Sequence, residues 1–165
     1  MYTVCITGHR PSKLFGYDVH SSLYDTLRAE ISKRLILLCN KYKEICCISG
    51  CALGTDTIFV EECQKLIDAG YNIHIKLAIP CRNHYARWSL EDRLRFEQMV
   101  DKYDHHYVVD GPYTANCLQL RNRYMVDHSD LILAVWDGSP SGTGNCVRYA
   151  QSKGKQVRRV PYVPH

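Results

Sequence analysis

The sequence predicts an α/β fold of the Rossmann-like type, a mostly parallel sheet of about five to six strands with helices on both faces. Six apolar runs rich in β-branched residues alternate along the chain with segments of helical periodicity. Strands that are apolar throughout and alternate with helices are typical of parallel sheets covered on both sides. The length of 165 residues, without an internal repeat or low-complexity segment, predicts one domain over residues 1–165.

The expected strands are residues 2–8, 44–50, 72–80, 105–110, 130–138 and 156–163. Most are dominated by Val, Ile, Leu, Ala or Cys, as strands buried on both faces require. The last run is basic and holds Pro161, and Pro164 follows it. Because proline is confined to the edges of sheets, this run predicts an edge strand that ends in a loose tail.

Helices are expected over residues 20–42, 55–69, 89–103, 115–128 and 143–153. The first is amphipathic, because its apolar residues recur at steps of three and four. These residues are Leu23, Leu27, Ile31, Leu35 and Leu38. In the third helix the same spacing predicts a buried face made by Leu90, Leu94 and either Met99 or Val100.

The composition is that of an ordinary soluble globular protein, with 45% hydrophobic and 23% charged residues. The formal net charge of +4 suits a small anionic ligand and is too weak to predict a nucleic-acid partner. No apolar run approaches the roughly 20 residues of a membrane span, and no signal peptide is recognisable at the N-terminus. We therefore expect a cytoplasmic protein with no membrane partner.

The nine cysteines are an odd number, and several lie inside apolar runs, where a thiol behaves as a small hydrophobic group. This usage favours free thiols in a reducing compartment over a disulfide framework. Zinc is the alternative, but Cys47 and Cys51 have no second pair of ligands to complete a site. We expect neither a metal nor a cofactor.

Unusual polar clusters follow four of the expected strands. They are TGHRP at 7–11, SGCALGTD at 49–56, PCRNHYARW at 80–88 and WDGSPSGTGN at 136–145. The carboxyl ends of parallel strands lie at one edge of the sheet, where open α/β folds bind their ligands. The sequence therefore predicts a binding site at this edge.

Two of these clusters lead into a helix through small residues, and both fit a phosphate. Glycines allow close approach of the backbone, and the first N–H groups of a helix have no partner within it. The first loop offers Ser49, Gly50, Gly54 and Thr55, and the second offers Ser141, Gly142, Thr143 and Gly144. The alternative is a tight strand-to-helix turn with Thr or Asp as the N-cap. Neither loop is a Walker A or a GxGxxG sequence.

Other side chains supplement the two loops. Arg10 can clamp a phosphate, and Trp88 or Tyr85 can stack on a nucleobase or anchor the core. Arg121 and Asn122 share one helix face with Leu118 and Met125, so they need a partner, either a ligand or a buried network to Asp127 or Asp137. The complete set expected at the ligand is Thr7, Gly8, His9, Arg10, Ser49, Gly50, Ala52, Leu53, Gly54, Thr55, Asp56, Trp88, Arg121, Asn122, Met125, Asp137, Gly138, Ser141, Gly142, Thr143 and Asn145.

Four stretches resemble a known family. They are TGHRP with Lys13, Leu14 and Gly16–Tyr17, then SGCALGTD, then RWSLEDRLRFEQM at 87–99 and LRNRYMVDHSDLILAVWDGSPSGTGNCVRYA at 120–150. They are similar to the YpsA-like branch of the SLOG superfamily, which also includes the DprA/Smf proteins and the Lonely guy phosphoribohydrolases. The resemblance runs from residue 3 to about 157. It implies a Rossmann-like fold that binds nucleotides or molecules derived from them.

The resemblance also implies a choice between roles. Lonely guy enzymes cleave an N-glycosidic bond and carry a PGGxGTxxE motif, whereas other SLOG domains are sensors in bacterial defence. In SPSGTGNCV, residues 139–147, the glutamate position falls on Cys146. We therefore expect a protein that senses or sequesters a nucleotide, an ADP-ribose-type molecule or a cyclic nucleotide signal, in defence or counter-defence, and that forms a homo-oligomer.

Two alternatives stay open. The first is an N-glycosidic hydrolase in which Asp56, Glu91 or Asp137 is the catalytic carboxylate, with Asp92 as a further source. The second is a module that binds single-stranded DNA as the DprA relatives do. No interleaved basic and aromatic stripe is evident, so nucleic acid is not the expected partner.

Overall fold

The computed structural model describes residues 1–162, which form one six-stranded sheet with helices on both faces. The strands are β1 Tyr2–Gly8, β2 Ile45–Ser49, β3 Ile73–Ile79, β4 Asp104–Tyr107, β5 Leu131–Val135 and β6 Gln156–Arg159. All neighbouring strands pair in parallel, in the order β4-β3-β2-β1-β5-β6. The predicted Rossmann-like fold is confirmed, and so is the edge position of the last strand. The end of that predicted strand, residue 163, lies outside the described residues.

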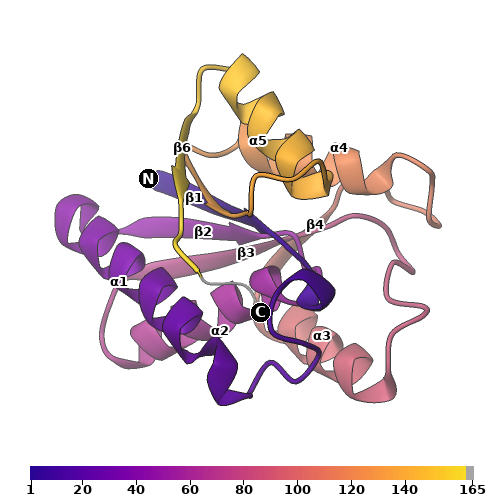
Figure 1. The fold of residues 1–165 in the computed structure, drawn as a ribbon, viewed down its shortest axis with the longest axis horizontal. Helices are drawn as coiled ribbons and strands as arrows, with labels where there is room; N and C mark the ends of the chain where they lie inside the picture. Colours follow the sequence, from indigo (N-terminus) through magenta and orange to yellow (C-terminus); the bar gives the residue numbers. More distant parts are fainter. Residues whose placement is uncertain (163–165) are drawn as a thin grey trace.

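The helices are α1 Asp25–Tyr42, α2 Thr55–Asp68, α3 Leu90–Lys102, α4 Cys117–Asp127 and α5 Gly142–Ser152, with short 3₁₀ turns at Pro11–Lys13 and Ser22–Tyr24. Figure 1 shows α1, α2 and α3 on one face of the sheet and α4 and α5 on the other. Each face has its own apolar core. The core under α1–α3 includes Leu27, Ile31 and Phe59, and the core under α4 and α5 includes Met125 and Cys146.

Two predicted helix faces are partly wrong. The first helix begins at Asp25, five residues later than expected at residue 20, and Leu23 lies outside it, 47% exposed. In α3 the side chains of Leu90 and Leu94 are 70% and 49% exposed, while Phe96 and Met99 are buried. Phe96 lies about 120° around the helix from Leu90. The helix therefore turns the Phe96 side toward the sheet.

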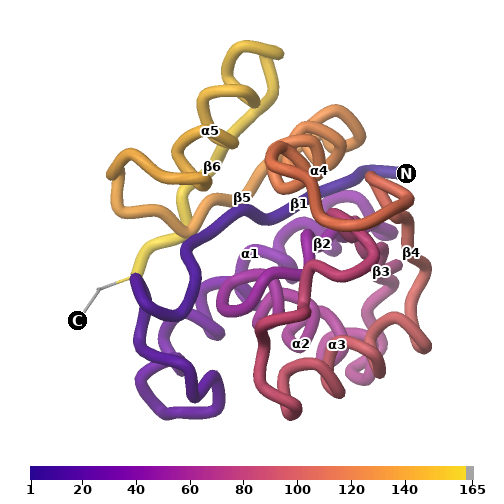
Figure 2. Tube along the Cα trace, turned by 90° about the vertical axis from the view of Figure 1, so that its right-hand side faces the viewer, coloured from indigo at the N-terminus to yellow at the C-terminus, as the bar shows by residue number. Residues whose placement is uncertain are grey.

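The strand order reverses between β1 and β5. The chain runs from β1 to β2, β3 and β4 on one side, and then returns to β5 and β6 on the other side (Figure 2). At such a switch point the connections from the two central strands leave in opposite directions and open a crevice at their carboxyl ends. Thr7 and Gly8 pair with Ala134 and Val135 here, so the TGHRP and WDGSPSG loops begin side by side.

Candidate functional site

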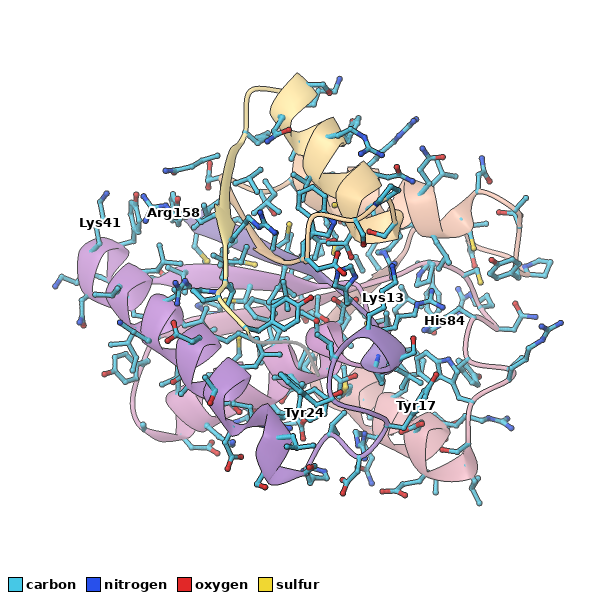
Figure 3. The ribbon with its side chains drawn as sticks, viewed as in Figure 1. Lys13, Tyr17, Tyr24, Lys41, His84 and Arg158 are labelled. Carbon is cyan, nitrogen blue, oxygen red and sulfur yellow. The ribbon has the colours of Figure 1, made fainter. Side chains whose placement is uncertain are left out.

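Two adjacent cavities lie at the carboxyl ends of the strands. The switch-point cavity, about 240 Å³, lies between the end of β1, α4 and the start of α5. The aromatic cavity, about 1060 Å³, lies between the loop after β1 and the loop after β3. Arg10, Ala52, Leu118 and Arg121 line both cavities. In Figure 3, Lys13 marks the first cavity, and Tyr17 and His84 mark the second.

Most of the predicted ligand residues line one of these cavities. Those on the switch-point cavity are Thr7, Gly8, His9, Arg10, Ala52, Asp56, Arg121, Asn122, Met125, Ser141, Gly142 and Thr143. Those that line only the aromatic cavity are Leu53 and Trp88, and Glu91, which was predicted as a catalytic candidate, lines this cavity too. The predicted residues that line neither are Ser49, Gly50, Gly54, Thr55, Asp137, Gly138 and Asn145.

The loop after β2 is a packed turn. The Ser49 hydroxyl donates to the backbone carbonyl of Asp56 at 3.0 Å, and the Thr55 hydroxyl donates to that of His9 at 3.0 Å. Gly54 has a φ of +86°, and a Cβ there would lie 3.0 Å from the His9 carbonyl oxygen. The contacts of Thr55 and Gly54 join this loop to the loop after β1, and the contact of Ser49 ties it to the start of α2. Packing therefore accounts for these small residues without a ligand.

The loop after β5 offers free backbone donors to the switch-point cavity. The Ser141 hydroxyl caps α5 by accepting from the N–H of Gly144 at 3.1 Å. Within residues 1–162, the N–H groups of Gly142 and Thr143 have no hydrogen-bond partner. They lie at the positive end of the helix dipole, so they favour an anion.

Arg121 adds a buried positive charge beside these donors. Its side chain comes from α4, and the residue is only 6% exposed. Nη1 donates to the carbonyl of Gly50, and Nε donates to Oδ1 of Asn122 at 2.9 Å. Neither Asp127 nor Asp137 is its partner, so the predicted alternative of a network to those residues is wrong. Nη2 has no partner in the described part of the chain, and the residue lines both cavities.

Asp56 places a carboxyl group on the wall of the same cavity. The residue is 5% exposed, and Oδ2 accepts from the N–H of Ala52 at 3.0 Å. Burial raises the pKa of Asp56, while the positive charge of Arg121 and the N–H of Ala52 oppose that rise. A carboxyl group held in this way can accept a hydrogen bond from a sugar hydroxyl or take part in proton transfer.

His9 and Asp137 form a contact next to the cavity. Nε2 of the buried His9 lies 3.0 Å from Oδ1 of Asp137 and 3.1 Å from its backbone nitrogen. The hydroxyl and the N–H of Ser139 also donate to this carboxylate, and they lower the pKa of Asp137, with a smaller effect from His9. Asp137 therefore shapes the loop after β5 through Oδ1, the oxygen that makes these contacts.

Aromatic rings and charged side chains surround the larger cavity. Trp88 is half-buried and makes edge-to-face contacts with His84, at 5.1 Å between ring centroids, and with Phe96, at 6.0 Å. Arg95 contacts Glu91 and Asp92, each at 3.4 Å. Sequence reasoning missed several residues of this cavity, including Tyr17, Arg87 and Tyr113. Tyr17 and Arg87 had a sequence signal, because each belongs to one of the stretches that resemble the family.

The comparison with known families decides the identity. Residues 4–162 match the sequence model of the family described as the YspA SLOG family. The chain belongs to the YspA SLOG family. The predicted resemblance is thereby confirmed over almost the whole chain.

Relatives of this YspA SLOG chain occur in bacteria. It is 36% identical over 154 residues to the SPbeta prophage-derived protein YoqJ of Bacillus subtilis (strain 168), covering 84% of this chain and 86% of the relative. It is 23% identical over 145 residues to a UPF0398 protein of Bacillus pumilus, covering 87% of this chain and 77% of that protein.

Solved structures of DNA processing protein A share the fold. The Helicobacter pylori protein, whose structure was described for its single-stranded DNA binding mode, matches with a TM-score of 0.65 at 20% identity. The Streptococcus pneumoniae protein matches with a TM-score of 0.66 at 18% identity. The match with the H. pylori protein covers 98% of this chain and 66% of that longer chain. The match with the S. pneumoniae protein covers 99% of this chain and 51% of that longer chain.

Two further observations concern residues 1–162 of this YspA SLOG protein. No helix in this part of the chain combines the length and apolar character needed to cross a membrane. Nor do these residues contain three His, Cys, Asp or Glu side chains grouped to hold a metal ion.

His84 of this YspA SLOG protein is expected to make stability depend on pH in the acid range. Burial is the main cause that lowers the pKa of His84 from 6.5 to about 4. The unfolded chain then binds more protons between these values, so stability is lost as pH falls through that window. In the wild-type protein this effect should lower the free energy of unfolding by on the order of 2 kcal/mol, and His84→Asn should remove that decrease. Urea unfolding at a series of pH values measures both proteins. If the free energies of unfolding of the two proteins differed by the same amount at every pH from 7 to 4, the expectation would be contradicted.

Proposed function

We propose that this protein binds a nucleotide or a nucleotide-derived signal, of the ADP-ribose or cyclic nucleotide type, with a phosphate in the switch-point cavity. One observation carries the proposal: the buried guanidinium of Arg121 and the free N–H groups of Gly142 and Thr143 line the same cavity. Nη2 of Arg121 has no acceptor within residues 1–162, and an anionic ligand in the cavity would supply one through a charge-assisted hydrogen bond. Arg10 and Lys13 line the same cavity and add positive charge at its mouth.

The arrangement of the carboxylates favours binding over cleavage. Glu91 lies on the other cavity and contacts Arg95, and Asp137 is held by Ser139 and His9. The position of the Lonely guy glutamate is Cys146, whose side chain is buried and has no carboxyl group. We infer that the protein senses or sequesters its ligand.

An N-glycosidic hydrolase is the alternative, and Asp56 is the candidate carboxylate that favours it. It is the one predicted catalytic residue on the switch-point cavity, and its pKa is raised by burial, as a general acid requires. Release of free base from a panel of nucleoside monophosphates by the wild-type protein, but not by Asp56→Asn, would establish this alternative.

Single-stranded DNA is a further candidate because a structural neighbour is described for binding it. The low net charge led us to expect no nucleic-acid partner, but charge alone is a weak argument against one. In the aromatic cavity, Arg10 and Arg87 lie among Tyr17, Trp88 and Tyr113, and such mixtures bind unpaired bases. Binding of oligothymidylate that is tighter than binding of ADP, and that weakens steeply with salt, would favour this role.

The wider setting is also proposed. A cytoplasmic homo-oligomer that sequesters a nucleotide signal would serve defence or counter-defence. The relative in B. subtilis is described as prophage-derived, which supports such a setting. Native mass spectrometry of the purified protein would give its oligomeric state and identify any small molecule that it carries.

Arg10→Gln tests the anion site without disturbing the core. Arg10 is exposed and lines both cavities, and its guanidinium makes no hydrogen bond within residues 1–162. A charge-assisted hydrogen bond to phosphate contributes about 1.5–3 kcal/mol, so we expect the Kd for ADP to rise at least about tenfold. Isothermal titration calorimetry would measure the Kd.

Arg158→Gln is the matched control for that experiment. It removes the same charge from an exposed position on β6 that lines neither cavity. Its Kd for ADP should equal that of the wild-type protein. Equal weakening in both variants would reveal a general charge effect and would overturn the proposed site.

A further inference from the structure

The switch-point cavity is too small for a whole nucleotide. Its volume of about 240 Å³ lies below the range of roughly 300–1,000 Å³ that is typical of complete small-molecule sites. It can hold a phosphate and part of a sugar, so the rest of the ligand must extend beyond it. The adjacent aromatic cavity, at about 1060 Å³, has ample room.

The two cavities share a wall, and two of the side chains in that wall are positively charged. Arg10 and Arg121 line both, so a phosphate bound by them would stand at the boundary. The group attached to that phosphate would then enter the aromatic cavity, past Ala52 and Leu118. In a nucleotide that group is the nucleoside.

Among the side chains that line the aromatic cavity, Trp88 is best suited to receive a planar ring. It is held by edge-to-face contacts with His84 and Phe96, and yet part of the residue remains accessible on the cavity. Held in one orientation, the indole loses little conformational entropy when a ring stacks on it. Tyr17 and Tyr113, 69% and 53% exposed, lie on the same cavity.

We propose that the aromatic cavity is the nucleobase site of the bound nucleotide and that Trp88 is its stacking surface. This inference rests on the proposed function, since it needs a phosphate anchored by Arg10 and Arg121. It assigns each end of the ligand to a different cavity, the phosphate to the smaller and the base to the larger.

Calorimetric titrations with ADP and with inorganic pyrophosphate separate the two ends of the ligand. Both carry a diphosphate, but only ADP carries a base. Base stacking on an aromatic side chain is worth on the order of a tenfold gain in affinity, so ADP should bind about tenfold tighter than pyrophosphate. Trp88→Ala should abolish most of that difference and leave the Kd for pyrophosphate unchanged, and Trp88→Phe should restore part of it.

Tyr85→Ala is the structural control. Tyr85 packs against Phe96 at 5.2 Å between ring centroids, as a member of the same aromatic cluster, but it lines neither cavity. The Tyr85→Ala variant should keep the wild-type ratio of the Kd for pyrophosphate to the Kd for ADP. If Trp88→Ala and Tyr85→Ala reduced the preference for ADP over pyrophosphate equally, Trp88 would only support the loop, and the inference would be overturned.

Fluorescence offers a test that does not remove Trp88. The chain has two tryptophans, so Trp136→Phe leaves Trp88 as the sole reporter. ADP should quench its emission and pyrophosphate should not. If pyrophosphate binds but ADP gains nothing and quenches nothing, the nucleobase site is wrong while the anion site stands. If neither compound binds, the proposed function fails as well.

Discussion

Gly8→Ala is expected to destabilise the fold by about 3 kcal/mol, because the position has no room for a methyl group. A Cβ there would lie 2.4 Å from both Oγ1 and Cγ2 of Thr55. Thr55 is fully buried, and its hydroxyl donates to the carbonyl of His9. Rotating the Thr55 side chain away would break that hydrogen bond, so the clash has no inexpensive relief.

Gly111→Ala is the matched control, since nothing lies within 4 Å of a Cβ at that position. Urea unfolding of both variants gives the comparison, with the free energy of unfolding extrapolated to water. We expect Gly111→Ala to lie within about 0.5 kcal/mol of the wild type, as surface substitutions do. A wild-type stability for Gly8→Ala would mean that the loops after β1 and β2 are not packed as described.

Arg121→Met is expected to cost about 3 kcal/mol of stability and to abolish binding of the anionic ligand. The substitution leaves the carbonyl of Gly50 without its buried donor, and it leaves the carboxyl of Asp56 without the nearby positive charge. Unpaired buried polar groups of this kind account for the largest effects of single substitutions. The free energy of unfolding and the Kd for ADP measure the two losses separately.

The double variant Arg121→Met/Asp56→Asn tests whether Asp56 and Arg121 interact. Asparagine needs no positive partner, so the double variant should be more stable than the sum of the two single effects predicts, by about 1 kcal/mol. Strict additivity would show that Arg121 stabilises the fold through its hydrogen bonds to Gly50 and Asn122 and not through Asp56.

The spacing of residues along a helix made part of the site predictable from the sequence. Leu118, Arg121, Asn122 and Met125 were predicted to share one face of a helix, and all four line the switch-point cavity on α4. The spacing that fixes such a face depends only on the helical period. The sheet and its binding edge were predictable for the same reason, because the alternation of apolar runs and helices determines them.

Long-range packing could not be read from the sequence. Gly8 packs against Thr55, and Gly50 packs against the side chain of Arg121. The residues of each pair lie far apart in the sequence, so no local pattern predicts these contacts. A glycine required by close packing looks the same as one required by a phosphate. Both loops therefore fitted a phosphate site in the sequence, although Ser49, Gly50, Gly54 and Thr55 line neither cavity, whereas Ser141, Gly142 and Thr143 line the switch-point cavity.

Asp137 did have a local signal that was overlooked. Ser139 follows two residues later, and an Asp whose carboxylate accepts from the backbone two residues on is typical of an Asx turn. The exposed leucines of α3 are a different case. Their spacing fits a buried face as well as the spacing of Phe96 and Met99 does, and only the rotation of the helix about its own axis decides which face is buried.

The most direct test of the anion site is a crystal structure of the protein with ADP bound. We expect a phosphate within hydrogen-bond distance of the backbone N–H groups of Gly142 and Thr143 and of the guanidinium of Arg121. A phosphate bound elsewhere on the protein, with the switch-point cavity filled only by water, would contradict the account.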